Sequence, residues 1–386
     1  MQTPKNIIIT SYYFLPENTP RAFRTFELAR EFSKKGHNVT LFIPDYDFNY
    51  GEIERRFNLK IHKVNSGFFL NRNHKRRYLG TQGSSSSNNS GFGKLLKKHI
   101  KKIVNYFIGD TTLEYSVELW RALLKHGTES DLVVSVGLPV SVHLGVAWAV
   151  NYGINLRAAK IADYGDPYYF NEVSKLCFYH KYLEDYFLKR FDYISIPTEK
   201  AIESYKYYKP EDKIKIIPQG FDFSETNKYE YSKNNKPSFA YAGLFYKIRN
   251  PRMMLDYLCD IKNDFNFFIY TDINHAETNE CLTPYLDRLK NKLIINKLIP
   301  RTECIKELSK MDFLVNVGNL TSNQIPSKLI DYSLSGRPIF SFQPDNFESE
   351  VFTDFLNGDF SNQLKVNISE YDIRLVADKF LGLCNN

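Results

Sequence analysis

A lysine and an aspartate three positions apart open a short helical segment late in the chain. The stretch over 323–340 reads NQIPSKLIDYSLSGRPIF, in which a loop carrying Lys328 leads into a predicted helix that carries Asp331 and ends at Gly336. The amide groups at a helix N-terminus, together with a lysine, attract a phosphate, and a carboxylate one turn further accepts hydrogen bonds from sugar hydroxyls. An ordinary loop–helix–strand unit would show the same glycine, so the motif needs support from the rest of the chain.

Other polar side chains stand where predicted strands end. Asp163 and Asp166 follow the apolar run over 158–162, where paired carboxylates would orient or deprotonate an acceptor hydroxyl. In an ordinary turn, the same aspartates would instead cap the next element. His143 follows the strand predicted over 131–136. This places it at the mouth of a site, although a lone histidine in apolar surroundings is usually a packed residue.

Strand-like and helix-like segments alternate along the whole chain. This alternation predicts an α/β fold with two Rossmann-like, doubly wound parallel-sheet domains that face a cleft. The predicted domains span 1–205 and 206–365, followed by a C-terminal helix over 366–386 that packs back on the first domain. Ligands of such sheets bind at the carboxyl ends of the strands, so they are expected to lie in that cleft.

The positive charge of the chain is concentrated in one region. Between Arg55 and Gly109 there are 13 Lys or Arg and no Asp or Glu, so the net charge of +7 becomes −6 when this region is removed. A flexible linker is predicted over 80–93. A basic amphipathic helix is predicted over 94–108, and it fits an anionic membrane surface or a simple solvated face. No RNA-binding signature accompanies the charge, so no nucleic-acid partner is expected.

The cysteines and the start of the chain favour a cytoplasmic protein. The five cysteines are dispersed and none forms a C-x-x-C pair, which argues against a disulfide framework or a zinc site. The start, MQTPKNIIIT, enters a strand directly and lacks the basic and apolar segments of a signal peptide. The apolar stretch over 132–150 contains Pro139 and His143 and is interpreted as a buried strand, a turn and a helix rather than a membrane span.

Ordered blocks along nearly the whole chain resemble the two-domain (GT-B) glycosyltransferases of family 4. The pattern P-S-K-x-x-D-Y-x-x-x-G-x-P over 326–338 is similar to the nucleotide-sugar motif of that family. Each further block is short, and the blocks occur in the order of the family: an opening strand, loop and helix over 13–39, then 135–145, 162–167, 217–222 and 241–251.

The resemblance implies transfer of a sugar from a nucleotide-diphosphate sugar to a glycan or polyprenyl-linked acceptor in bacterial polysaccharide biosynthesis. It also implies retention of anomeric configuration, no cofactor or required metal, and a peripheral position on the inner face of the plasma membrane. The implied donor-binding residues are Arg249, Lys328, Asp331, Asn323, Gln324, Ile325, Pro326, Ser327, Gly243, Gln219 and Ile299. The implied acceptor-binding residues are Tyr13, Arg21 and Arg24, and the implied catalytic residues are His143, Asp163 and Asp166.

Several positions depart from the pattern of the family. Asn323 stands where a sugar-contacting glutamate is usual, and Gly165 replaces the arginine of a D-x-R-D-P block. Asn18 and Thr19 replace a Gly-Gly pair, and Leu244 replaces an arginine. These departures leave two alternatives open, a nucleotide-sugar epimerase of similar fold and a binding subunit without catalytic activity.

Overall fold

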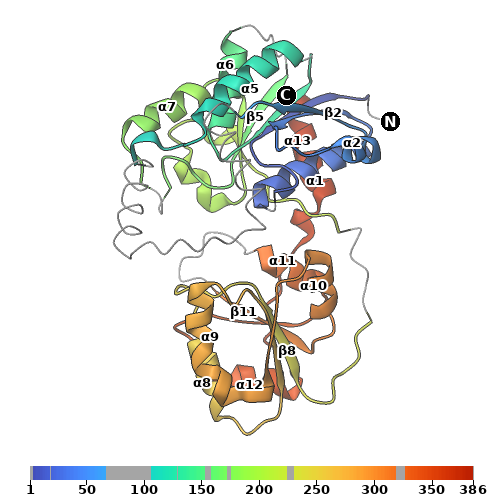
Figure 1. The fold of residues 1–386 in the computed structure, drawn as a ribbon, viewed down its shortest axis with the longest axis vertical. Helices are drawn as coiled ribbons and strands as arrows, with labels where there is room; N and C mark the ends of the chain where they lie inside the picture. Colours follow the sequence, from blue (N-terminus) through green and yellow to red (C-terminus); the bar gives the residue numbers. More distant parts are fainter. Residues whose placement is uncertain are drawn as a thin grey trace. The chain divides into compact units, whose positions relative to one another are not determined.

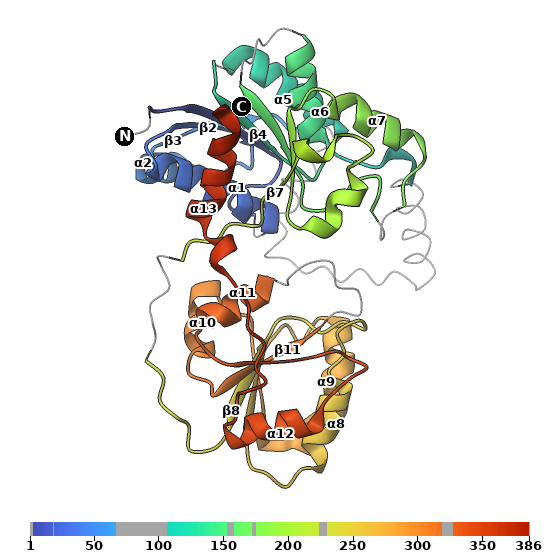
Figure 2. The ribbon, with the colours of Figure 1, turned by 180° about the vertical axis from the view of Figure 1, so that it is seen from behind.

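The structure is a computed structural model that describes residues 3–17, 19–66, 106–127, 129–152, 158–171, 175–223, 230–318 and 327–385. The chain divides into two compact units (Figures 1 and 2). The first unit contains 1–222 and 370–386, and the second contains 223–369. The linker predicted over 80–93 and most of the basic helix predicted over 94–108 lie outside the described residues.

The first unit is built on a parallel sheet of seven strands in the order β3-β2-β1-β4-β5-β6-β7. The strands are β1 (Asn6–Ser11), β2 (Asn38–Pro44), β3 (Leu59–Val64), β4 (Leu132–Val136), β5 (Ala159–Asp163), β6 (Tyr193–Ile196) and β7 (Ile214–Ile216). Strand β1 pairs with β2 on one side and with β4 on the other, so the strand order reverses between β1 and β4. The chain therefore leaves these two strands toward opposite faces of the sheet, and the point between them is the usual position of a ligand in such sheets.

Helices cover both faces of this sheet. They are α1 (Pro20–Lys34), α2 (Gly51–Phe57), α5 (Leu113–His126), α6 (Ser141–Asn151), α7 (Tyr179–Leu188) and α13 (Ile373–Leu381), with short 3-10 helices η2 (Glu199–Ser204), η3 (Glu211–Lys213), η5 (Ser369–Tyr371) and η6 (Gly382–Asn385). Because side chains alternate along a strand, Ile8 joins the core under α5, α6 and α7, whereas Ile7 and Ile9 join the core under α1 and α13.

The boundary between the units lies later than the sequence predicted. The strand at 214–216 was assigned to the second domain, but β7 pairs with β6 at the edge of the first sheet. The C-terminal helix α13 packs on α1, with the rings of Phe32 and Phe380 6.4 Å apart. The first unit thus takes in both ends of the chain.

The second unit has a parallel sheet of five strands in the order β10-β9-β8-β11-β12. The strands are β8 (Ser238–Ala242), β9 (Asn266–Tyr270), β10 (Leu293–Asn296), β11 (Phe313–Val317) and β12 (Ile339–Phe342), and the helices are α8 (Arg252–Asp260), α9 (Ala276–Leu289), α10 (Arg301–Leu308), α11 (Ser327–Leu334) and α12 (Ser349–Asn357), with the 3-10 turn η4 (Lys290–Lys292). Its core is rich in aromatic rings, and Phe239 stacks on Phe313 at 4.8 Å. Here the strand order reverses between β8 and β11.

Both sheets are parallel throughout and both are covered by helices on two faces, so the predicted fold class is confirmed. Each central strand is buried on both faces, as the apolar runs predicted. Among the described residues, no helix combines the length and the hydropathy needed to cross a bilayer.

Candidate functional site

The switch point of the second unit brings together the end of β8 and the start of α11. Gly243 follows β8 with φ +126°, a conformation that side-chain-bearing residues rarely adopt, and it turns the chain sharply at the sheet edge. The buried Tyr332 of α11 accepts a hydrogen bond from the Ala242 amide at 2.8 Å. This contact fixes the first turns of α11, including Lys328, beside the carboxyl end of β8.

Lys328 lies over a tyrosine and close to another cation. Its Nζ is 4.4 Å from the centre of the Tyr241 ring and donates to the Tyr241 Oη at 3.3 Å. Removal from water, and then the nearby Arg249 guanidinium, lower the pKa of Lys328 to about 7. No carboxylate contributes to that pKa among the described residues, so the two predicted phosphate-binding cations stand together without a nearby acid to offset Lys328.

The loop that carries Arg249 is hydrogen-bonded to helix α9. Thr278 is fully buried, and its Oγ1 accepts from the Phe245 amide at 3.1 Å and lies 3.3 Å from the Phe245 carbonyl. The Tyr241 Oη also donates to the Leu244 carbonyl at 2.9 Å. Sequence analysis missed Thr278, because a threonine 29 positions beyond Arg249 carries no local signal of this contact.

Asp331 forms an ion pair that the sequence did not predict. Its Oδ1 is 2.7 Å from the guanidinium of Arg301, at the start of α10. Removal from water raises the pKa of Asp331, although Arg301 acts in the opposite direction. One carboxylate oxygen is therefore engaged by Arg301. Ile299 is partly buried against the core below, two residues before that arginine.

Part of the predicted donor site cannot be placed. Asn323, Gln324, Ile325 and Pro326 lie outside the described residues, and of Ser327 only the backbone is described, as the first residue of α11. Gln219 follows β7 and belongs to the first unit, whereas the other described donor residues belong to the second unit.

In the first unit, Asp163 is the centre of a buried ion cluster at the end of β5. Its two carboxylate oxygens are 2.8 Å from Arg24 and 3.2 Å from Arg21, and the Ser195 hydroxyl donates to it at 2.7 Å. Burial alone would raise the pKa of Asp163, but the guanidinium groups of Arg24 and Arg21 hold it below its ordinary value. A carboxylate so firmly ionised and paired is a poor proton acceptor, which favours a positioning role over the predicted role as a base.

The guanidinium of Arg24 is engaged by other groups of the first unit. It is 2% exposed, and it donates to the carbonyl groups of Pro218 and, at 3.3 Å, of Ile217. Its guanidinium also lies 5.2 Å from the centre of the Phe380 ring. With Asp163 included, this arrangement leaves Arg24 little capacity for the predicted contact with an acceptor.

Gly165 explains where the guanidinium of Arg21 lies. A Cβ at position 165 would come within 2.3 Å of the Arg21 Nη2, so the absence of a side chain there makes room for Arg21. The replacement of the D-x-R-D-P arginine by glycine therefore does not remove positive charge from this place. Asp166, which is exposed, contributes to the electrostatic environment of Arg21.

His143 lies in the core of the first unit rather than at its surface. The ring is fully buried, its Nδ1 is 2.8 Å from the Ser135 Oγ, and its centre is 4.6 Å from that of Tyr164. Burial lowers the pKa of His143 to about 3, so the ring is neutral. This placement favours a packing role over the predicted contact with a reacting sugar. Tyr13 is partly exposed and follows β1 at the switch point of this unit.

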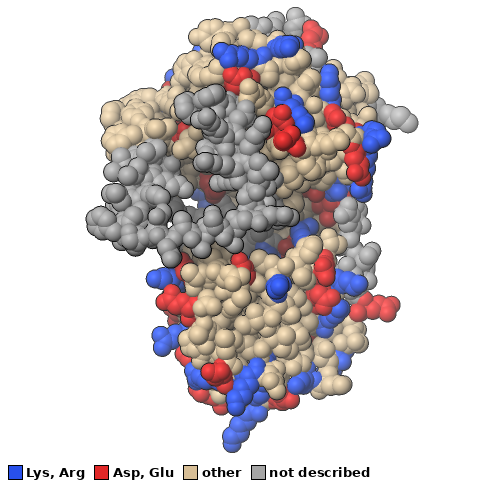
Figure 3. All heavy atoms as spheres, viewed as in Figure 1, with Lys and Arg blue, Asp and Glu red and all other residues tan. Residues whose placement is uncertain are grey.

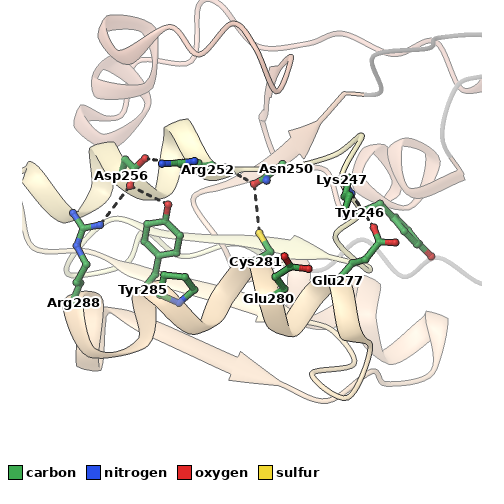
Figure 4. Close-up of a pocket in the computed structure, with 11 residues that line it drawn as sticks. Tyr246, Lys247, Asn250, Arg252, Asp256, Glu277, Glu280, Cys281, Tyr285 and Arg288 are labelled. Atoms are coloured by element: carbon green, nitrogen blue, oxygen red, sulfur yellow. Dashed lines mark hydrogen bonds and ion pairs between the residues drawn. The ribbon is translucent and has the colours of Figure 1, made fainter. Parts of the chain in front are cut away.

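A separate groove lies between α8 and α9 of the second unit, with a volume of about 570 Å³. Figure 4 shows Asp256 in contact with Arg252, Tyr285 and Arg288, so these polar groups satisfy one another. None of the predicted donor residues lines this groove. Among the described residues, no group of three or more His, Cys, Asp or Glu is placed to hold a metal ion.

Solved glycosyltransferase structures share this architecture over the whole chain. A glycosyltransferase from Rickettsia africae ESF-5 has a TM-score of 0.65 at 13% identity, over 100% of this chain and 98% of that one. Anabaena HepE (Alr3699), solved with UDP and glucose, has a TM-score of 0.56 at 9% identity, over 99% and 97%. The lipopolysaccharide outer core galactosyltransferase WaaB has a TM-score of 0.57 at 12% identity, over 98% of each chain. No protein-family profile and no curated protein sequence matches the chain. The likeness shows that the chain has the two-domain GT-B fold of these glycosyltransferases.

Proposed function

We propose that the protein is a glycosyltransferase that moves a sugar from a nucleotide-diphosphate sugar to a glycan or lipid-linked acceptor. The observation that carries this proposal is the proximity of two cations, Lys328 and Arg249, at the switch point of the second unit. Two like charges held close together cost free energy, and a bound dianion would offset that cost. A diphosphate has the charge and the size to do so.

The same groups suit the chemistry of transfer. Cleavage of the bond between sugar and diphosphate builds negative charge on the leaving β-phosphate. Lys328, Arg249 and the N-terminus of α11 would stabilise that charge as it develops. Asp331, one helical turn beyond Lys328, would accept hydrogen bonds from ribose hydroxyls while Arg301 holds its other oxygen.

The acceptor and the stereochemistry complete the proposal. Tyr13, Arg21 and Asp166 follow β1 and β5 of the first unit and are the residues proposed to meet the acceptor. The resemblance to family 4 supports retention of configuration, metal-independent transfer and a role in bacterial polysaccharide assembly at the inner face of the membrane. The names of the structural neighbours, which include a complex with UDP and glucose and a galactosyltransferase, support a nucleotide-activated hexose as donor.

A binding experiment tests the proposal directly. Thermal shift with a panel of nucleotide sugars should find a ligand that raises the apparent stability, and calorimetry then gives its affinity. Lys328→Met should weaken that affinity by about 10- to 100-fold, the usual loss of one charge-assisted contact. Lys310→Met is the matched control, because Lys310 lies in the same unit and pairs with Glu307 on the surface.

Three outcomes would contradict the proposal. Equal affinities for the wild type and for Lys328→Met would mean that the diphosphate lies elsewhere. Conversion of one nucleotide sugar into another without an acceptor would identify an epimerase, and tight binding with no hydrolysis or transfer would identify a binding subunit.

A further inference from the structure

Helix α7 of the first unit presents aromatic side chains to solvent along one face. Phe178, just before the helix, and Tyr182 are 69% and 61% exposed, and Tyr186 continues the row at the same spacing of four. The opposite face, with Glu184 and Phe187, is buried. A surface helix normally exposes charged and polar residues to water. An exposed row of aromatic side chains is therefore unusual and indicates an interaction surface.

The row is widened by the segment that precedes α5. The Tyr106 carbonyl accepts from the Cys177 amide at 3.0 Å, and the Phe107 carbonyl lies 3.1 Å from the His180 Nε2. These contacts hold Tyr106 and Phe107 beside the start of α7, where Phe107 is 54% exposed. We call the resulting surface the aromatic face, and it consists of Tyr106, Phe107, Phe178, Tyr179, Tyr182 and Tyr186. Figure 3 shows few charged side chains on the part of the surface over α7.

The charged residues near the aromatic face along the sequence are mainly basic. Between 175 and 190 there are four basic residues and two acidic ones. Of the two acids, Glu184 is buried and Asp185 is paired with Lys189 at 2.6 Å. The region over 55–109, which contains 13 Lys or Arg and no acidic residue, includes Tyr106 and Phe107 themselves.

We propose that the aromatic face docks on an anionic lipid bilayer, with its rings at the level of the headgroups. Tyrosine and phenylalanine have an apolar body, and the tyrosine hydroxyl stays hydrated, which suits the interfacial layer of a membrane. The surrounding cations add attraction to anionic lipid. The ten residues of α7 make a rod of about 15 Å, which lies in the plane of the interface.

A protein partner fits these features less well. Protein interfaces are depleted in lysine at their centres, whereas Lys181 directly precedes Tyr182 in α7, and its Nζ lies 3.6 Å from the centre of the Tyr207 ring. The inference deepens the membrane contact that forms part of the proposed function, and it moves that contact from the predicted helix over 94–108 to described residues. Vesicle binding does not depend on transfer, so the two proposals fail separately.

Vesicle flotation tests the docking surface. The full-length protein should bind vesicles with 30% phosphatidylglycerol more tightly than vesicles of pure phosphatidylcholine. The double variant Phe178→Ser/Tyr182→Ser should lower the partition coefficient by at least about tenfold. The matched control is Met253→Ser/Leu286→Ser, which removes two exposed apolar side chains of the second unit and should bind as the wild type does. Thermal unfolding checks that both variants are folded.

A tryptophan probe gives a second readout that does not weaken the surface. Tyr182→Trp should show a blue shift of its emission on anionic vesicles, and brominated lipid should quench it. The proposal would be overturned if the double variant had the same partition coefficient as the wild type. It would also be overturned if anionic vesicles did not change the emission of Tyr182→Trp. A dimer in light scattering that becomes a monomer in the double variant would also overturn it, because the face would then be a contact between copies. Loss of nucleotide binding with vesicle binding intact would contradict only the proposed function.

Discussion

The two units place cations at corresponding ends of their sheets and use them differently. In the first unit, Arg21 and Arg24 converge on the buried Asp163, so the charges stabilise one another. In the second unit, Lys328 and Arg249 stand together, and no carboxylate influences the pKa of Lys328. The difference indicates that the first cluster maintains the fold, and it supports our proposal that the second binds an anionic ligand.

The largest expected effect breaks the cluster of the first unit. Asp163→Asn leaves the buried Arg24 and the partly buried Arg21 without their carboxylate and should lower the free energy of unfolding by about 3–5 kcal/mol. Denaturant unfolding followed by circular dichroism measures this. Asp185→Asn is the control, because its ion pair with Lys189 is near the surface and is worth at most about 1 kcal/mol. Equal losses in the two variants would remove the distinction between a structural and a functional cluster.

The next effect concerns pH and the cluster of the second unit. The pKa of Lys328, about 7, lies below the ordinary lysine value of 10.5, so between these values the unfolded chain binds a proton that the folded chain does not. Lys328 therefore lowers stability progressively as the pH falls from about 10.5 to about 7, with little change below. A bound diphosphate favours the charged lysine, so affinity for the nucleotide sugar should fall by up to about tenfold per pH unit above pH 7.

Calorimetry at pH 8 in two buffers of different ionisation enthalpy detects the coupled proton. Binding to the wild type should take up close to one proton. Lys328→Arg keeps its charge throughout this range and should remove both the proton uptake and the pH slope. Binding to the wild type without proton uptake would show that Lys328 does not meet the diphosphate.

A smaller effect tests how Gly165 and Arg21 share space. Gly165→Ala places a methyl group against the guanidinium of Arg21, which is flexible enough to move, and should cost about 1 kcal/mol of stability. In an Arg21→Ala background, the same change should be nearly neutral. A double-mutant cycle from denaturant unfolding gives the coupling directly. Additive effects would mean that Arg21 does not depend on the missing side chain.

The smallest expected effect loosens the loop that carries Arg249. Thr278→Val removes the hydroxyl that holds the Phe245 backbone and should weaken nucleotide-sugar binding by about fivefold, in keeping with the loss of one hydrogen bond. Thr278→Ser keeps the hydroxyl and should bind nearly as the wild type does. If Thr278→Val loses stability but not affinity, helix α9 supports only the fold.

The fold was accessible from the sequence to a greater extent than the site. Runs such as 132–136 and 313–317 are apolar throughout because their strands are buried on both faces, and that pattern is local. The assignment of β7 to the second domain was wrong, because the sequence of a three-residue edge strand does not indicate which sheet the strand joins. Lys328 and Asp331 were proposed from their spacing, and both lie in α11, although their role in a site stays a prediction.

The contacts that decide the roles of these residues are long-range. The pairing of Asp331 with Arg301 spans 30 positions and that of Arg24 with Asp163 spans 139. Whether a charged side chain is paired or free depends on such partners. Residue types and spacing therefore singled out candidate residues near the strand ends, but they did not show that Asp163, Arg24 and His143 are buried.

The hydrogen bonds from Arg24 to the carbonyl groups of Ile217 and Pro218 hold the chain where it leaves the first unit. Beside this point, the Phe221 amide donates to the Tyr371 carbonyl at 2.8 Å, and the Ile373 amide donates back to the Phe221 carbonyl at 3.0 Å. The chain therefore leaves the first unit and returns to it at neighbouring points. In topological terms, the second unit is a domain inserted into the first, and the two connections between them lie close together. A short linker from 222 to 370 would close the first unit without stretching the backbone, and the inserted domain over 223–369 could be exchanged for another as a block.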